Sequence, residues 1–219
     1  MSPAILLVLI YIAFVSLGLP DGVLGVAWPA MRLGLDQPVQ AAGLITTVVT
    51  GCSALSGFAS GAVLKRFSAG AVVTASGFLT GLALLGFGHA PSFALLLALA
   101  VPLGLGAGAV DAAMNHFVAR HYASRHMNWL HGSWGLGATL GPVIMGAALA
   151  SGVRGVEPWR LGYQQIGALQ LALALVFLLS LRLWRQAPDR ADSAVGADQA
   201  VGGHARSAQR LRLAQWLAP

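Results

Sequence analysis

Six long apolar segments, separated by short polar stretches, occupy most of this 219-residue chain. Each is close to the roughly 20 residues that a helix needs to cross a bilayer. Backbone groups must be paired inside hydrocarbon, and apolar runs this continuous are not those of barrel strands. The pattern predicts an all-α polytopic membrane protein with transmembrane helices at Pro3–Met31, Val39–Leu64, Ala69–Phe87, Ser92–Ala119, Asn128–Ala150 and Leu161–Leu183.

The composition supports this interpretation and excludes a soluble protein. Hydrophobic residues make up 57% of the chain and charged residues only 9%, whereas soluble domains carry about 25% charged residues. The net charge of +6 comes from basic residues placed singly or in pairs between apolar segments, so we expect a lipid bilayer and no nucleic acid as partner. Cys52 is the only cysteine, which excludes an intramolecular disulfide.

The distribution of charge predicts the orientation in the membrane. Alternate loops face opposite sides, and the side with more basic residues is normally cytoplasmic. That side would collect Lys65, Arg66, Arg120, Arg125, Arg182 and Arg185, and the other side Arg32, Arg154 and Arg160. Both termini are then cytoplasmic. The Arg-rich, nearly Lys-free composition is typical of bacteria of high genomic GC content, so the predicted location is the inner (plasma) membrane.

Aromatic and small residues give further expectations about packing. Trp28 and Trp159 fall near predicted outer ends, and Trp129 and Trp184 near inner ends, as in an interfacial aromatic belt. Glycines one helical turn apart allow helix backbones to approach closely. Such pairs are Gly18 with Gly22, Gly57 with Gly61, Gly77 with Gly81, Gly104 with Gly108, and Gly137 with Gly141.

The chain divides into two regions by composition. Residues 1–185 form the predicted six-helix transmembrane domain. Residues 186–219 are rich in Ala, Gly, Asp, Gln, Ser and Arg, which predicts a flexible cytoplasmic linker. Its last stretch, Arg206–Leu217, has the pattern of a short basic amphipathic helix lying on anionic lipid.

Two carboxylates inside apolar segments are the strongest functional candidates. Asp21 in the first segment and Asp111 in the fourth would each cost about 2.5 to 3.5 kcal/mol to insert when ionised. Asp21 follows Gly18 and Pro20, and such an interruption is typical of a discontinuous helix that lines a cavity. A carboxylate in such a place can load and unload a proton, although Asp21 capping a helix break is an alternative.

Other polar residues lie near these carboxylates in the pattern. Asn115 is one turn from Asp111 on the same helix face, and it offers an amide either to a polyol or to a neighbouring helix. His131 lies just inside the fifth segment beside Trp134, which suggests a substrate-side or proton-relay group or a helix-bridging histidine. Histidines spaced by five turn about 140° around a helix, so His116, His121 and His126 predict no metal site.

An intramembrane serine protease of rhomboid type is a rival interpretation. Its nucleophile motif is Gly-x-Ser-Gly, and here Ser133 falls one position early in Gly132-Ser133-Trp134-Gly135. Such an enzyme also needs a histidine on a later helix to activate the serine, and the sixth segment has none. We therefore expect no enzyme activity and no cofactor.

Two segments resemble transporters of the major facilitator superfamily, in the fucose-permease-like group of sugar transporters. Gly18–Pro29 (GLPDGVLGVAWP) looks like the first helix of that group, and Gly104–Asn115 (GLGAGAVDAAMN) resembles its fourth helix. In fucose-type symporters an acid in each of these helices handles the proton. The resemblance implies that Asp21 and Asp111 are the proton-coupling pair, with the proton gradient as driving force and Asp111 standing where many relatives have Glu.

A third segment, Leu130–Pro142 (LHGSWGLGATLGP), is similar to the fifth helix of the group, which makes Asn115, His131 and Trp134 the expected substrate-binding residues. Gly61–Phe67 (GAVLKRF) is a degenerate form of the signature after the second helix, with Lys65 where an acid is usual, which puts a charge relay there in doubt. The pattern of Gly137, Gly141 and Pro142 also occurs in drug/proton antiporters, so a drug or metabolite exporter stays an alternative, as does a non-transporting membrane scaffold.

The resemblance extends to about Arg185, which is one six-helix half of a family built from two such halves, with substrate bound between them. We expect a secondary transporter of a sugar or small polar solute, truncated to its N-terminal half, whose partner is a missing C-terminal half or a second copy. The isolated monomer is expected not to transport.

Overall fold

The computed structural model describes residues 3–151 and 155–184. Every regular element in those ranges is a helix, and six spans are long and apolar enough to cross a membrane, which confirms the predicted fold class. The helices are α1 (Pro3–Gly18), α2 (Val23–Gly34), α3 (Ala41–Leu64), α4 (Ala69–His89), α5 (Phe93–His121), α6 (Arg125–Ala150), α7 (Pro158–Leu179) and α8 (Leu181–Trp184). The predicted linker and amphipathic helix at 186–219 lie outside the described residues.

The first predicted helix is interrupted, as the sequence suggested. Together α1 and α2 make one span, and a turn at residues 19–22 separates them. Pro20 lacks a backbone N–H and so cannot bond to the carbonyl of Ser16, one turn earlier. Gly22 has a φ of 75°, a conformation that residues with a side chain rarely adopt. This combination ends α1 in the interior of the bundle.

Several helix ends differ from the apolar limits in the sequence. The fifth span begins at Arg125 rather than Asn128, because polar residues at a helix end continue the hydrogen-bonded backbone. The sixth begins at Pro158, where proline suits the first turn, and it stops at Leu179 before the one-turn α8. Ser68 and Ser92 cap α4 and α5 by accepting hydrogen bonds from backbone N–H groups.

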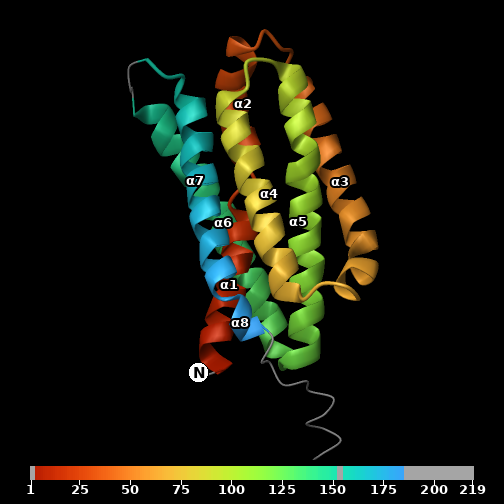
Figure 1. Cartoon of the computed structure of the whole chain (residues 1–219). Helices are drawn as coiled ribbons and strands as arrows, with labels where there is room; N and C mark the ends of the chain where they lie inside the picture. Colours follow the sequence, from red (N-terminus) through yellow and green to blue (C-terminus); the bar gives the residue numbers. More distant parts are fainter. Residues whose placement is uncertain (1–2, 152–154, 185–219) are drawn as a thin grey trace, which may run out of the picture.

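The helices form a bundle in which α4 lies between α5 and α7 (Figure 1). On one side α6 packs along α1, and on the other α3 packs mainly against α5. Two apolar clusters fill the two ends of the bundle. One contains Met31, Phe87 and Trp159, and the other contains Phe14 and Phe117.

Close helix contacts follow the predicted glycines at most positions. A side chain at Gly137 would overlap the backbone of α1, one at Gly141 the backbone of Leu19 just after α1, and one at Gly108 the backbone of α3. The expectation was wrong for Gly57 and Gly61, whose Cβ positions face open space on α3. A sequence spacing shows that close approach is possible, but a neighbour must also be present on that face.

The predicted aromatic belt was wrong for three of its four residues. The side chains of Trp28, Trp159 and Trp184 are buried in the bundle, whereas Trp129 is 67% exposed. Trp28 donates a hydrogen bond from Nε1 to the carbonyl of Val39 (2.9 Å), so it joins the end of α2 to the start of α3. The three buried tryptophans lie towards the ends of the membrane spans, as predicted, but neighbouring helices cover their side chains.

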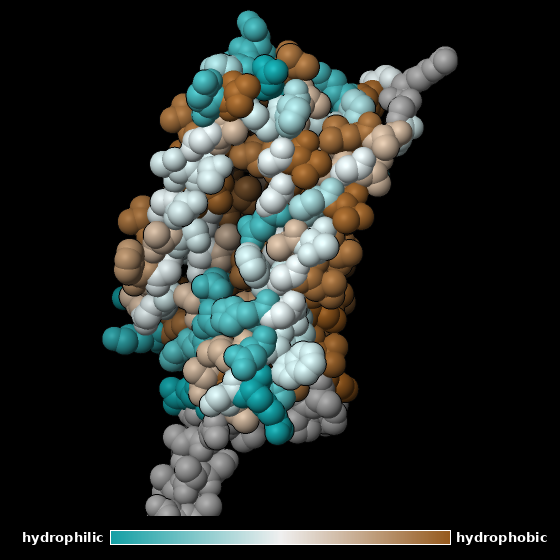
Figure 2. All heavy atoms as spheres, turned by 180° about the vertical axis from the view of Figure 1, so that it is seen from behind, coloured by the Kyte–Doolittle hydropathy of each residue, from teal (hydrophilic) through white to brown (hydrophobic). Residues whose placement is uncertain are grey.

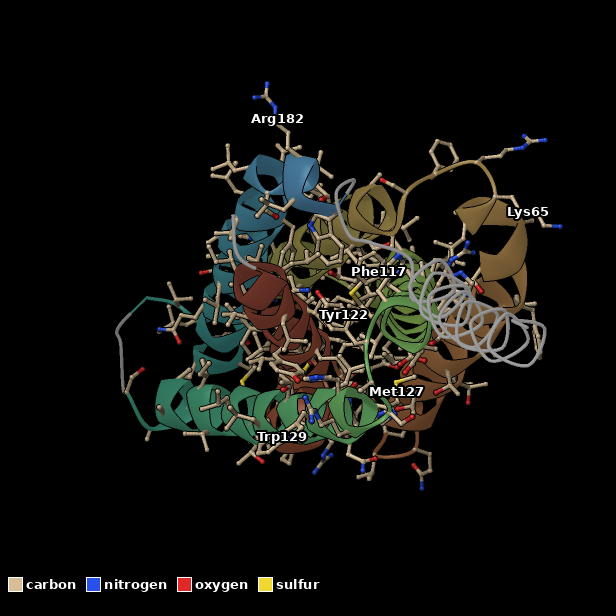
Figure 3. The ribbon with its side chains drawn as sticks, turned by 90° about the horizontal axis from the view of Figure 1, so that it is seen from below. Lys65, Phe117, Tyr122, Met127, Trp129 and Arg182 are labelled. Carbon is tan, nitrogen blue, oxygen red and sulfur yellow. The ribbon has the colours of Figure 1, made fainter. Side chains whose placement is uncertain are left out.

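Most of the described basic residues gather at one end of the bundle, whereas Arg32 and Arg160 lie at the other. Figure 3 looks at that end, where Lys65 and Arg182 point away from the helices and Phe117 and Tyr122 lie between them. It is also the end from which α1 starts (Figure 1). This arrangement is the one that the charge pattern predicted, and the assignment of that end to the cytoplasm stays a prediction.

Candidate functional site

A cleft of about 250 Å³ lies midway along the bundle where four helical elements meet. We call it the central cleft. Its lining comes from the break after α1, from α3, α5 and α6, and consists of Leu17, Asp21, Val49, Thr50, Ser53, Ala107, Asp111 and Trp134. The face opposite to that of Figure 1 is hollowed between two columns of helices, with hydrophilic residues exposed inside (Figure 2). Three of the five site residues predicted from the sequence therefore converge here.

A second cavity of about 190 Å³ adjoins the central cleft and shares with it Asp21, Thr50 and three apolar residues. It extends from the helix break towards Phe87 and Tyr163 on α4 and α7. Asp21 lines both cavities. The two together make a space of the size that a small polar solute requires.

The helix break places Asp21 where the two cavities adjoin. Its carboxylate oxygen Oδ2 accepts a hydrogen bond from the indole Nε1 of Trp134 on α6, at 2.8 Å. The backbone of α6 touches α1 at Gly18 and Gly137 and touches Leu19 of the break at Gly141, which leaves no room for side chains at these glycines. This close contact fixes the position of Asp21 relative to α6.

Asp111 faces the cleft from α5. Its carboxylate Oδ1 accepts a hydrogen bond from Nδ2 of Asn115, and the same amide also donates to the Asp111 carbonyl, both at 3.0 Å. The predicted pairing on one helix face is therefore present. The rise of 1.5 Å per residue puts Asp111 roughly 15 Å from the end of α5 at His121 and Trp134 roughly 14 Å from the start of α6. Both thus lie near the middle of a hydrocarbon core about 30 Å thick.

Asn115 and His131 do not line the central cleft, although both lie close to it in the fold. Asn115 contacts the cleft through its bond to Asp111. His131 is exposed, and its ring packs edge-on against Phe14 with the centroids 6.0 Å apart. Both residues lie on the side of the cleft that leads to the basic end of the bundle.

His121 and His126 make local contacts at the basic end. His121 bonds to the carbonyl of Phe117 on its own helix, while Nδ1 of His126 lies 2.7 Å from the hydroxyl of Tyr11 on α1. No group of three His, Cys, Asp or Glu side chains able to hold a metal occurs within the described ranges. Ser133, the serine of the rival protease motif, donates its hydroxyl to the carbonyl of Trp129.

A buried polar network lies behind the cleft and was not predicted from the sequence. Gln170 on α7 is only 3% exposed, and its amide links α1 to α4. Its Oε1 accepts from the hydroxyl of Ser16 at 2.9 Å, and its Nε2 donates to the hydroxyl of Thr80 at 3.0 Å. Gln170 is the one polar side chain in the run Ile166–Leu179, and that isolation was the available signal. The network anchors the last turn of α1 before the break.

Hydroxyl groups of α3 were also missed. Thr50 and Ser53 line the central cleft opposite the two carboxylates. In the sequence they are two of many small polar residues along an apolar helix, so nothing singled them out. The lining of the cleft thus combines two carboxylates, two hydroxyls and an indole N–H, and among the described residues it includes no basic side chain. Such a set suits a proton and a neutral, hydroxyl-bearing solute.

The chain matches the family model described as Major Facilitator Superfamily over residues 10–217. The match covers every described helix apart from the start of α1. A search of curated proteins found no similar sequence.

Proposed function

This chain belongs to the Major Facilitator Superfamily, a family of secondary transporters, and we propose that it works by proton-coupled symport of a sugar or another small polar solute. The observation that carries the proposal is the convergence of Asp21 and Asp111 on one cleft in the middle of the bundle. Ionisable residues at that depth are costly and mark ion pathways in membrane proteins. Two of them from helices distant in sequence give the cleft a place for a transported proton.

The lining gives each residue a role in the proposal. Asp21 and Asp111 bind the proton, and Asn115 orients the carboxylate of Asp111 through its amide. Thr50 and Ser53 offer hydroxyls to a polyol, and Trp134 offers the edge and face of its indole. Protonation of the carboxylates lowers the charge of the cleft, which favours a neutral solute entering together with the proton. The likeness to fucose-type symporters supports this direction of coupling.

The cleft is open along the side between α3 and α6, so we propose that a second six-helix unit completes it. Members of this class bind substrate between two halves that rock against each other. The second unit is either a C-terminal half or a second copy of this chain. His131 would then lie on the route between the cleft and the basic end of the bundle.

The proposal is tested by measuring proton uptake when solutes bind to the full chain reconstituted in liposomes. A panel of hexoses, pentoses and their polyols is added, and proton movement is followed with a pH-sensitive dye. We expect one solute class to give proton uptake. Asp21→Asn and Asp111→Asn should each reduce that uptake by at least about tenfold. Each substitution removes a carboxylate that stabilises the protonated state by more than about 1.4 kcal/mol, which corresponds to a factor of ten. Asp36→Asn, at an exposed loop outside the cleft, is the matched control.

Other results would identify a different function. Proton release on solute addition would indicate an exporter instead of a symporter. The glycine pattern shared with drug/proton antiporters does not favour that function here, because Gly137 and Gly141 serve the contact with α1. Unchanged behaviour of both Asp variants in every respect except expression would indicate a membrane scaffold.

A further inference from the structure

We propose that Trp134 is a proton-controlled gate of the central cleft, held across it by Asp21 while that carboxylate is ionised and released when the carboxylate takes up a proton. The inference rests on the proposed function, in which Asp21 binds the coupled proton. Trp134 acts here as a positioning residue, because it controls entry to the cleft and exchanges no proton itself.

The geometry of the pair carries the proposal. The indole Nε1 donates to Oδ2 of Asp21 at 2.8 Å, and both side chains line the same cleft. An indole N–H can only donate, so its best partner is an ionised carboxylate. Trp134 lines the cleft and is 40% exposed, so its ring is not locked in the core. One hydrogen bond therefore decides where a large movable side chain rests.

The backbone around this bond has little freedom. Gly18 at the end of α1 lies against the backbone of Trp134 and Ala138, while Gly141 lies against the carbonyl of Leu19, the first residue of the break. Because this close contact holds the end of α1 and the first residue of the break against α6, a change in the bond is expressed as rotation of the indole.

The chemical contrast between the two states is large enough for a gate. Hydrogen bonds to charged partners are roughly twice as strong as those between neutral groups. Protonation places a proton on the Asp21 carboxylate and leaves the indole N–H intact, so no covalent bond to the ring changes. The weaker bond then raises the population of released indole by roughly tenfold.

The groups around the pair allow the response to be assigned to Asp21. Asp111 faces the cleft from α5, and Tyr163 faces the adjoining cavity from α7. On α6, the ring of His131 packs against Phe14. Helix α3 lines the two cavities with side chains that carry no charge: Ile45, Thr46, Val49, Thr50 and Ser53. Asp21→Asn and Asp111→Asn separate the contributions of the two carboxylates.

The test measures the accessibility of Trp134 in the full chain in liposomes. Acrylamide quenching of tryptophan fluorescence is recorded as the pH is lowered, and subtraction of the Trp134→Phe signal isolates this residue. We expect quenching of the isolated signal to rise with acidity in the wild type and in Asp111→Asn. In Asp21→Asn it should be high at every pH. Trp129, on the same helix and 67% exposed, is the matched control, whose isolated signal should not depend on pH.

An infrared titration separates failure of the gate from failure of the proposed function. The carboxylic acid band that Asp21→Asn removes reports the proton on Asp21 directly. A titrating band with a flat Trp134 signal overturns the gate and leaves proton coupling in place. No titrating band from Asp21 or Asp111 overturns both. If Trp134→Phe fails to fold, Trp134→Tyr is used for the fluorescence subtraction instead. A Trp134 signal that still depends on pH in Asp21→Asn would also contradict the gate.

Discussion

Helices α3 and α4 have almost the same character in the sequence and opposite positions in the fold. The most apolar stretch of each helix has a mean hydropathy of 1.5 in α3 and 1.7 in α4. Yet 11% of that stretch is buried in α3 and 61% in α4. Helix α4 is enclosed by α5 and α7, whereas α3 leans mainly on α5 (Figure 1). Hydropathy therefore shows that a helix crosses the membrane, and its neighbours decide whether it forms the core.

The two helices also serve the candidate site differently. Thr80 on α4 holds Gln170 and through it Ser16, so α4 anchors the break in the first span from behind. Helix α3 presents Thr50 and Ser53 to the cleft and leaves its far side uncovered. Helix α4 therefore forms the anchored side of the cleft and α3 its uncovered side. A cleft that a second unit completes, and against which that unit moves, needs both.

The largest expected effect comes from Gly81 on α4 and Gly57 on α3, each of which belongs to a pair of glycines one helical turn apart. A Cβ at Gly81 on α4 would meet the side chain of Leu171 at 2.7 Å and its backbone nitrogen at 3.2 Å, whereas Gly57 on α3 has open space. Gly81→Val should lower the free energy of unfolding by about 1 to 3 kcal/mol, the usual cost of overpacking. Gly57→Val should change it by less than about 0.5 kcal/mol. Unfolding in sodium dodecyl sulfate measures both, and equal losses would contradict the contrast between the helices.

A smaller effect is expected from a pair of threonines. Thr80→Val removes the acceptor for the buried Gln170 amide and should cost about 1 kcal/mol, as is typical of interhelical hydrogen bonds in membranes. Thr47 on α3 donates only to the carbonyl of Gly43 in its own helix and is exposed, so Thr47→Val should be nearly neutral. Unfolding in sodium dodecyl sulfate measures the effect of both substitutions. A neutral Thr80→Val would show that the network does not hold the break.

The smallest effect on stability, and the sharpest test of exposure, comes from two alanines. Ala54 on α3 is exposed and Ala83 on α4 is 2% exposed. In a Cys52→Ser background, Ala54→Cys should react readily with a lipid-soluble maleimide, and Ala83→Cys should not. Protection of Ala54→Cys in the bilayer, relieved when the protein is diluted in detergent, would show that a second unit covers α3.

The candidate site was partly predictable for a definite reason. Asp21 and Asp111 stand out because a carboxylate in an apolar run is expensive, and that cost can be read residue by residue. Thr50 and Ser53 carry no such cost, so their roles depend on which helices they face. Gln170 stands alone in an apolar run, but its partners also depend on the packing of the helices. Trp134 was expected to bind solute, and the structure adds that it already has a partner, Asp21.

By itself the sequence determined the all-α fold, the six spans and the interruption at Pro20, because bilayer thickness, backbone hydrogen bonding and the missing N–H of proline act locally along the chain. Only the tertiary structure decided that Trp28, Trp159 and Trp184 are buried and that Gly57 and Gly61 are open. It alone brought Asp21, Asp111 and Trp134 to one cleft. Lipid and protein interior are almost equally apolar, so hydropathy cannot tell which face of a helix meets which, and only the packing of side chains between helices resolves it.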